Sequence, residues 1–168
     1  ACFGIRTTVV GQAMSDTLEN GDQVLLNKIV YKISKPKADD VIVFLPNGNE
    51  KSHYYVRRVI GIPGDRVQIK DGAVYINGEL YNEKIEVAAM EETGIAGDEI
   101  VLGEDEYFVL GDNRNNSEDS RYANIGNIKK ATFIAPSADT ANIPTFLQRN
   151  WKRKKSRKAL SEHVMLLI

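Results

Sequence analysis

Cysteine is nearly absent from this chain, which has one, Cys2, among 168 residues. A single cysteine cannot form an internal disulfide. The two histidines, His53 and His163, lie far apart, so no Cys/His cluster offers a metal site. No apolar run reaches the ~18 residues that a membrane-spanning helix needs. These absences exclude a disulfide framework, and we expect neither a metal ion nor another cofactor.

Positive charge is concentrated at the C-terminal end of the chain, and the rest of the chain is mildly acidic. The net charge is −1, but the last twenty residues contain seven Lys or Arg and one Glu, which gives +6 there and leaves −7 for residues 1–148. A mildly acidic body argues against nucleic acid as its ligand. The basic end is a solvated charge run, a contact with a membrane surface, a segment that is not native, or the start of a second membrane anchor.

Short apolar runs separated by turn residues predict a mostly β fold. The β-branched and aromatic residues in these runs favour strands. Asp71 and Gly72, between two alternating runs, are a strong hairpin signal. Many short strands with little helix predict antiparallel sheets or a partly open barrel. The expected strands cover residues 23–26, 41–44, 54–60, 67–70, 73–76 and 107–110.

Two segments depart from this pattern. Residues 82–104 contain seven acidic residues and three glycines, and we expect a smaller, variable cap at about residues 80–106. Residues 149–164 have neither Gly nor Pro, so we predict a basic helical tail over residues 149–168. The predicted organisation is one domain over residues 1–148 followed by this tail.

Four segments carry the most specific signal. Residues 11–22 read Gly-Gln-Ala-Met-Ser-Asp-Thr-Leu-Glu-Asn-Gly-Asp, and residues 40–44 read Asp-Val-Ile-Val-Phe. Residues 55–65 read Tyr-Val-Arg-Arg-Val-Ile-Gly-Ile-Pro-Gly-Asp, and residues 111–121 read Gly-Asp-Asn-Arg-Asn-Asn-Ser-Glu-Asp-Ser-Arg. In this order they resemble the four signature boxes of type I signal peptidases. The fourth segment matches its family pattern throughout.

The resemblance implies a signal peptidase-like fold and a Ser/Lys dyad. In that family a serine hydroxyl attacks the carbonyl of the signal-peptide bond, and a lysine kept neutral by burial takes the hydroxyl proton. Here the nucleophile position holds Ala13 and the base position holds Arg57. Ala13 has no side-chain oxygen, and a guanidinium stays protonated. The resemblance therefore predicts that neither member of the catalytic dyad is intact.

Residues that support the dyad in the family persist. Ser117 matches a serine that hydrogen-bonds the lysine. Asp16 stands where the family has proline. Because a buried guanidinium needs a carboxylate or solvent, we predict an ion pair between Arg57 and an aspartate near the site. The supporting positions are Gly11, Met14, Asp16, Arg58, Asp112, Ser117, Asp119 and Arg121, and the candidate partners of Arg57 among them are Asp16, Asp112 and Asp119.

Three explanations of Ala13 stay open. The serine was lost naturally, or it was removed by a designed inactivating substitution, or Ser15 is a displaced nucleophile. Arg57 cannot activate Ser15 as a general base. His53, four residues before Arg57, would be ~13 Å away along a strand, too far to replace the base without a bulge.

These observations lead to a non-enzymatic prediction. The resemblance extends to signal peptidase-like proteins that lack the dyad and assist pilus polymerisation on Gram-positive bacteria. We therefore expect an inactive assembly factor or chaperone whose partners are pilin subunits, a sortase, or signal peptide-like segments. The alternative is a type I signal peptidase that cleaves signal peptides of exported proteins, with its dyad substituted. A third possibility is a decoy that sequesters signal peptides.

Location follows from the same resemblance. Residues 1–5 are apolar and begin abruptly. We expect a single membrane anchor before residue 1 and a domain on the extracytoplasmic face of the cell membrane, close to the lipid surface.

Overall fold

The computed structural model describes residues 4–15, 17–27, 35–46, 53–129 and 133–134. The chain divides into two compact units, residues 1–137 and 138–168, and the second lies wholly outside the described residues. The predicted helical tail over residues 149–168, with its boundary at residue 148, therefore lies outside them as well.

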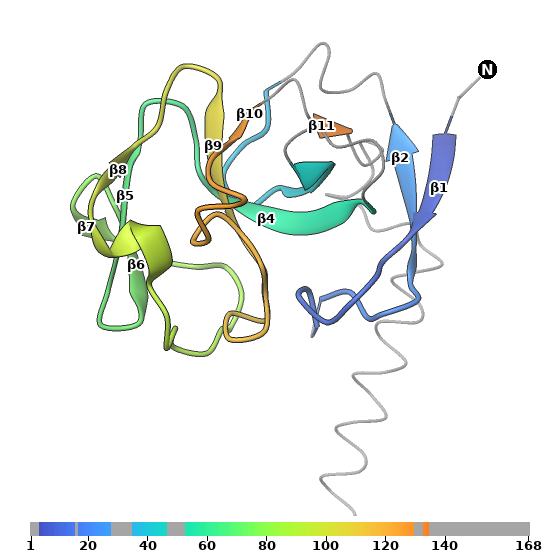
Figure 1. Ribbon diagram of the computed structural model, residues 1–168, viewed down its shortest axis with the longest axis horizontal. Coiled ribbons are helices and arrows are strands. Elements are labelled where there is room, and N and C mark those ends of the chain that lie inside the picture. Colours follow the sequence, from blue (N-terminus) through green and yellow to red (C-terminus); the bar gives the residue numbers. More distant parts are fainter. Residues whose placement is uncertain (1–3, 16, 28–34, 47–52, 130–132, 135–168) are drawn as a thin grey trace, which may run out of the picture. The chain divides into compact units, whose positions relative to one another are not determined.

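Three antiparallel sheets form the described part of the first unit (Figure 1). The first pairs β1 (Gly4–Thr8) with β2 (Gln23–Asn27). The second has the order β10-β9-β4-β3-β11 and the third the order β7-β6-β5-β8. The prediction of a mostly β fold of antiparallel sheets is confirmed, and these sheets do not close into a barrel. The second sheet consists of β3 (Val41–Phe44), β4 (Tyr55–Gly61), β9 (Glu106–Leu110), β10 (Ile128–Lys129) and β11 (Phe133–Ile134).

Strand β4 lies at the centre of the five-stranded sheet and holds residues 55–61 of the third box. Six of its seven residues are buried, because β3 and β9 flank it and side chains pack on both faces. The pairing with β9 shifts register between Val59 and Gly61. A Cβ added at Gly61 would lie 2.6 Å from a methyl of Val67, so glycine permits the close approach of β5.

The four-stranded sheet shows the predicted hairpin. Asp71 and Gly72 join β5 to β6 with φ angles of 50° and 75°, the positive pair that a type I′ turn requires. Asn77 and Gly78 form a similar turn between β6 and β7, with positive φ angles of 55° and 85°. The sheet consists of β5 (Arg66–Lys70), β6 (Ala73–Ile76), β7 (Glu79–Leu80) and β8 (Ile100–Val101).

The predicted cap at about residues 80–106 is part of this larger sheet. Strand β8 pairs with β5, and a short 3₁₀ turn, η2 (Gly94–Gly97), precedes it. Residues 80–106 thus contribute β8 and η2 to a sheet whose first strand, β5, begins at Arg66. Sequence reasoning separated the hairpin from the cap because a two-residue edge strand carries no readable alternation.

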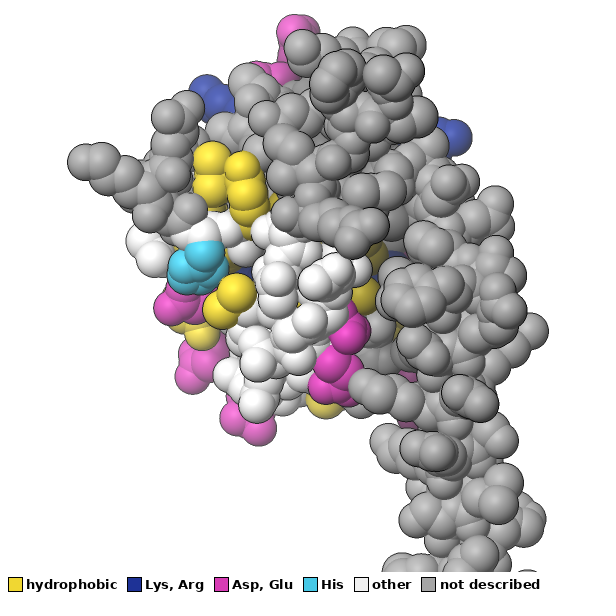
Figure 2. All heavy atoms as spheres, turned by 90° about the vertical axis from the view of Figure 1, so that its right-hand side faces the viewer, with side chains coloured by type: hydrophobic (Ala, Val, Ile, Leu, Met, Phe, Trp, Pro, Cys, Tyr) yellow, Lys and Arg dark blue, Asp and Glu magenta, His cyan; other side chains and the backbone are white. Residues whose placement is uncertain are grey.

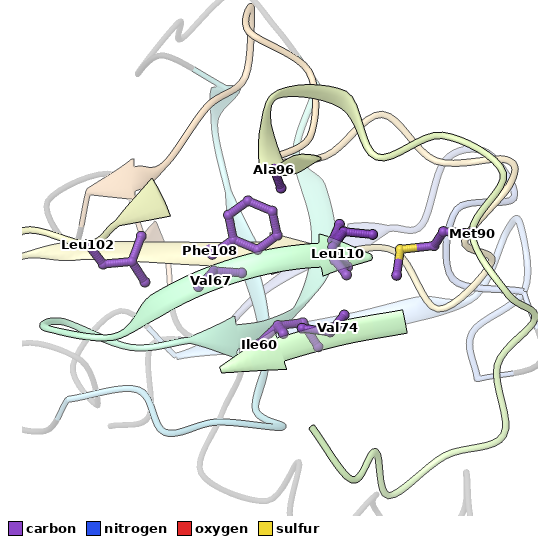
Figure 3. Packing of buried hydrophobic residues seen from close by; sticks show 9 residues of the cluster. Ile60, Val67, Val74, Met90, Ala96, Leu102, Phe108 and Leu110 are labelled. Carbon is purple, nitrogen blue, oxygen red and sulfur yellow. The ribbon is translucent and has the colours of Figure 1, made fainter. Parts of the chain in front are cut away.

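Three hydrophobic clusters hold these sheets together. In the first, β4 and β9 contribute Ile60, Phe108 and Leu110, which pack against side chains of the four-stranded sheet and of the loop around η2 (Figure 3). Burying each of these larger side chains contributes about 1.5–3 kcal/mol. The third cluster packs Met14 against Val43 and Val56, which fixes the first box beside the centre of the second sheet.

Candidate functional site

Three of the four boxes meet at one pocket. Its cavity is ≈ 380 Å³, and the first, third and fourth boxes line it together with the residues just before β4. The face in Figure 2 carries a histidine side chain with hydrophobic and acidic side chains beside it. The lining residues are Val10, Gly11, Gln12, Ala13, His53, Tyr54, Tyr55, Arg57, Asn115, Asn116, Ser117, Glu118 and Tyr122.

The first box is a tight turn that presents Ala13 to the pocket. Gly11 has a φ of 90°, and its N–H donates to Oδ1 of Asn20 at 2.9 Å. Met14 is 1% exposed and anchors the turn in the core. The carbonyl of Ala13 accepts a hydrogen bond from the N–H of Asn113 at 3.0 Å. The position predicted for the nucleophile is therefore held against the fourth box by main-chain contacts.

Arg57 is buried beside this turn and is bound by carbonyl groups. Its Nε and Nη2 donate to the carbonyl of Glu118 at 2.9 and 2.6 Å, and its Nη1 donates to the carbonyl of Val56 at 2.7 Å. The guanidinium carbon lies 4.8 Å from the centre of the Tyr55 ring. Burial lowers the pKa of Arg57, which is only 6% exposed.

The predicted ion pair between Arg57 and an aspartate is not found among the described residues. Asp112 pairs with Arg58 and Asp119 pairs with Arg121, while Asp16 lies outside the described residues. The physical reason is that backbone carbonyls already accept hydrogen bonds from all three nitrogen atoms of Arg57.

Arg58, which points to the opposite face of β4, forms a bidentate ion pair with Asp112. Its Nε and Nη2 donate to Oδ1 and Oδ2 of Asp112 at 2.8 and 2.7 Å, and the Thr17 hydroxyl donates to Oδ2 at 2.5 Å. Burial alone lowers the pKa of Arg58, but the hydrogen bonds and charge of Asp112 outweigh burial and raise that pKa. The pair joins the first, third and fourth boxes.

Asp119 and Arg121 stabilise the fourth box internally. Nε and Nη2 of Arg121 donate to Oδ1 and Oδ2 of Asp119 at 2.8 and 3.0 Å. The N–H of Gly111 donates to Oδ2 of Asp119 at 3.1 Å. This pair shapes the loop that brings Ser117 to the pocket.

Ser117 has an unusual environment. Its hydroxyl oxygen is buried and has no hydrogen-bond partner. A Cβ added at Gly111 would lie 2.2 Å from that oxygen and 2.5 Å from the carbonyl oxygen of Ala13, so the first and fourth boxes pack closely here. Ser117 therefore lies where the boxes predict it, beside the turn that holds Ala13.

The pocket also contains residues to which the sequence analysis assigned no role in the site. Glu118 supplies the carbonyl that holds Arg57, and its carboxylate accepts a hydrogen bond from the Tyr55 hydroxyl at 2.9 Å. The His53 ring stacks on Tyr55 at 5.2 Å between ring centres. Glu118 occupies a variable position of the fourth box, so no sequence signal could identify it.

Within the described ranges, no cluster of His, Cys, Asp and Glu side chains is arranged to hold a metal ion. No helix in the same ranges has the length and hydrophobicity to span a bilayer.

Comparison with known proteins decides the family. The model of the family described as signal peptidase, peptidase S26, matches residues 2–138. The chain belongs to this signal peptidase family. The boxes at 11–22, 40–44, 55–65 and 111–121 all lie within the matched segment, so the family resemblance seen in the sequence is confirmed.

Several curated relatives of the family are similar to the chain. Signal peptidase I P of Bacillus subtilis subsp. natto is 38% identical over 120 residues, which are 67% of this chain and 64% of the relative. Probable signal peptidase I-2 of Synechocystis is 36% identical over 131 residues, 71% of this chain and 58% of the relative. The chain thus spans about three fifths of the length of these relatives. A crystal structure of a signal peptidase I from Enterococcus faecalis matches with 31% identity and a TM-score of 0.46, covering 62% of this chain and 97% of that one.

The prediction that the chain is not an enzyme is contradicted by these relatives. They are named as signal peptidase I, which is an enzyme, and each match covers 67% of this chain. The prediction extended the chemistry of two side chains, Ala13 and Arg57, to the whole domain. The segment that carries those two positions matches the model of this peptidase family as a whole.

Proposed function

We propose that the chain is a signal peptidase I domain that recognises signal peptides of exported proteins at the extracytoplasmic face of the cell membrane. The observation that supports this proposal is the pocket at which the first, third and fourth boxes meet, with residues 13 and 57 on its lining. The pocket has the size of a small ligand site and lies beside paired strands, as sites for extended peptides do. The names of the relatives supply the substrate class.

We place the family's cleavage chemistry at positions 13 and 57. A serine at position 13 would attack the peptide carbonyl, and a neutral lysine at position 57 would take its proton. The environment of position 57 suits a lysine base. The side chain there is 6% exposed, and among the described residues no carboxylate forms an ion pair with it, so burial would lower the pKa of a lysine at this position.

The paired substitution Ala13→Ser and Arg57→Lys tests this proposal. Cleavage of a pre-protein with an Ala-x-Ala site should be at least about 100-fold faster with the double variant than with the unmodified chain, since both groups of the dyad are needed together. Each single substitution should give less than a tenth of that gain. The measurement is kcat/KM from the appearance of the mature protein.

Two controls make the test decisive. Adding Ser117→Ala to the double variant should lower kcat more than it raises KM, because Ser117 positions the base. Arg66→Gln, an exposed residue of the four-stranded sheet, should change neither constant. Equal rates for the unmodified chain and the double variant would show that the reacting groups lie elsewhere.

The predicted role in pilus assembly, with pilins or a sortase as partners, draws no support from the relatives described above. Their names favour the cleavage of signal peptides, which was the alternative prediction.

A further inference from the structure

Arg57 carries a buried positive charge that its hydrogen bonds do not neutralise. Three of its five N–H groups donate to the carbonyls of Glu118 and Val56. Carbonyl oxygens satisfy hydrogen bonds but carry no net charge. Because no carboxylate among the described residues forms an ion pair with Arg57, the pocket retains a positive charge at low exposure.

Ser117 adds a second unsatisfied group to the same pocket. Its hydroxyl is buried without a partner, and a hydroxyl donates a hydrogen bond to any suitably placed oxygen. Ser117 directly precedes Glu118, whose carbonyl holds Arg57. A buried polar group without a partner costs free energy unless a ligand satisfies it. One ligand carboxylate near these residues would pair with the Arg57 charge and accept a hydrogen bond from the Ser117 hydroxyl.

The charges of two acids act on Arg57, and the stronger of them, Asp119, is already paired with Arg121. The other is Glu118, which competes for the Arg57 charge from the lining of the pocket. Its carboxylate lines the pocket, is exposed, and accepts a hydrogen bond from the Tyr55 hydroxyl at 2.9 Å. It therefore acts on Arg57 through space and not as an ion-pair partner. A ligand carboxylate that accepts two hydrogen bonds from the guanidinium would interact with Arg57 more strongly than the Glu118 carboxylate does from its present position.

The rest of the pocket suits a short peptide end with small side chains. The cavity of ≈ 380 Å³ is at the small end of ligand sites. The methyl group of Ala13 lies on its lining, and Val10 and Tyr122, which are 59% and 44% exposed, add apolar surface for neighbouring peptide residues. The pocket thus combines a cation, a buried hydroxyl without a partner and limited apolar space.

We propose that this pocket binds the free C-terminal carboxylate of a peptide that ends in a small residue. The carboxylate pairs with the Arg57 guanidinium and accepts a hydrogen bond from the Ser117 hydroxyl. This inference rests on the proposed function, because a signal peptide cut after a small residue has such an end. The site then takes the released product in preference to the uncut precursor.

Four peptides labelled at the N-terminus test this inference. Three share a signal-peptide sequence ending in Ala-x-Ala and carry a free acid, a C-terminal amide, or a five-residue extension, and the fourth is a scrambled sequence with a free acid. Fluorescence anisotropy on the unmodified chain gives each Kd. The free acid should bind at least about 10-fold more tightly than the amide and the extended peptide.

Protein variants assign the preference to named groups. Arg57→Gln should reduce the acid-to-amide ratio to about 1, and Ser117→Ala should reduce it about 3-fold. Glu118→Gln, which removes the competing acid, should strengthen binding of the acid peptide alone. Arg66→Gln, an exposed arginine whose nearest acid is Glu99 at 3.9 Å, is the matched control and should leave all four values unchanged.

The outcomes separate this inference from the proposed function. If acid, amide and extended peptides bind equally and more tightly than the scrambled peptide, the carboxylate site is wrong and signal-peptide recognition stands. If the scrambled acid binds as tightly as the native acid, the carboxylate site stands and recognition of signal-peptide sequence is wrong. If no peptide binds, both proposals are wrong. Because acid and amide are compared on the unmodified chain, a variant that fails to fold does not affect this decision.

Discussion

Two adjacent arginines on β4 have different surroundings. Successive side chains of a strand point to opposite faces, so Arg57 faces the pocket while Arg58 faces Asp112. Arg58 forms two hydrogen bonds to that carboxylate, whereas Arg57 donates only to carbonyls. The charge of Arg58 is therefore paired with a carboxylate, whereas the hydrogen bonds of Arg57 all go to uncharged oxygen atoms.

The substitution Arg58→Met should destabilise the protein strongly. It would leave the Asp112 carboxylate, whose side chain is 2% exposed, without its counter-charge. Removing one partner of a buried ion pair costs about 3–5 kcal/mol. The free energy of unfolding, from urea denaturation followed by circular dichroism, should fall by this amount.

A double-substitution cycle separates the pair from its surroundings. Arg58→Met combined with Asp112→Leu should recover most of the loss, since no charge then stays buried. If the two losses simply add, Arg58 and Asp112 do not stabilise the fold as a pair. The Thr17 hydroxyl, which loses its acceptor in the double variant, limits the recovery to less than the full amount.

Sequence identified the residues of the site better than their partners. The resemblance gives four charged residues as supporting positions, and the structure shows that they form two buried ion pairs, Arg58 with Asp112 and Arg121 with Asp119. The expected partner of Arg57 was an aspartate, but Arg57 donates its hydrogen bonds to the backbone carbonyls of Glu118 and Val56. A backbone carbonyl is present at every residue, so a sequence cannot show which one approaches a side chain.

At the scale of elements, the junction after β9 depends on the absence of a side chain. Gly111 lies between the end of β9 and the fourth box, against both Ser117 and the first box. An added Cβ would lie 2.2 Å from the Ser117 hydroxyl oxygen and 2.5 Å from the Ala13 carbonyl oxygen. Because one of these atoms belongs to the backbone, a rotamer change alone cannot relieve the clash.

Gly111→Ala should therefore separate the first and fourth boxes. Overpacking of this kind costs about 1–3 kcal/mol, and it should also weaken peptide binding, because both boxes line the pocket. Thermal unfolding and the anisotropy assay measure the two effects. Gly103→Ala is the matched control, since a Cβ there meets only the Glu106 side chain at 3.4 Å or more. Similar losses in both variants would argue against this view of the junction.

The strands differ in how far the sequence predicts them. Strands β3, β4, β5, β6 and β9 follow from apolar and β-branched runs bounded by turn residues, and the structure confirms them. Strands β7, β8 and β10 have two residues each, and alternation over two residues cannot be distinguished from chance. Their position depends on the longer strand that each one pairs with.

At the scale of the whole first unit, polar contacts tie the four-stranded sheet to the site. The Tyr81 hydroxyl, just after β7, donates to Oδ1 of Asp39 at 2.6 Å, and Lys84 pairs with Oδ2 of Asp39 at 2.7 Å. The Asp39 carbonyl in turn accepts a hydrogen bond from Arg58 at 2.8 Å. Arg114 of the fourth box forms a second tie through its ion pair with Glu83. The cap therefore supports the boxes through a connected set of hydrogen bonds.

The free energy of unfolding at high pH should depend on the first of these contacts, the hydrogen bond from Tyr81 to Asp39. Burial, followed by the hydrogen bond and charge of Asp39, raises the pKa of Tyr81 above its ordinary value of 10.0. The folded state thus keeps the phenol proton at a pH where the unfolded chain releases it. The stabilisation is complete below about pH 10 and is lost as pH rises through the folded-state pKa.

Tyr81→Phe removes this linkage together with the hydrogen bond. Near pH 8 the variant should be about 1 kcal/mol less stable than the parent, the usual worth of such a bond. Between about pH 10 and pH 11 the difference in stability should shrink, because only the parent then loses the contribution of Tyr81. Burial also raises the pKa values of Tyr55 and Tyr107, but both residues are present in both proteins and do not affect the difference. Urea denaturation at a series of pH values measures the difference. A constant gap from pH 8 to about pH 11 would show that the proton of Tyr81 does not hold the cap to the site, because ionisation of a tyrosine that makes this contact must change the free energy of unfolding.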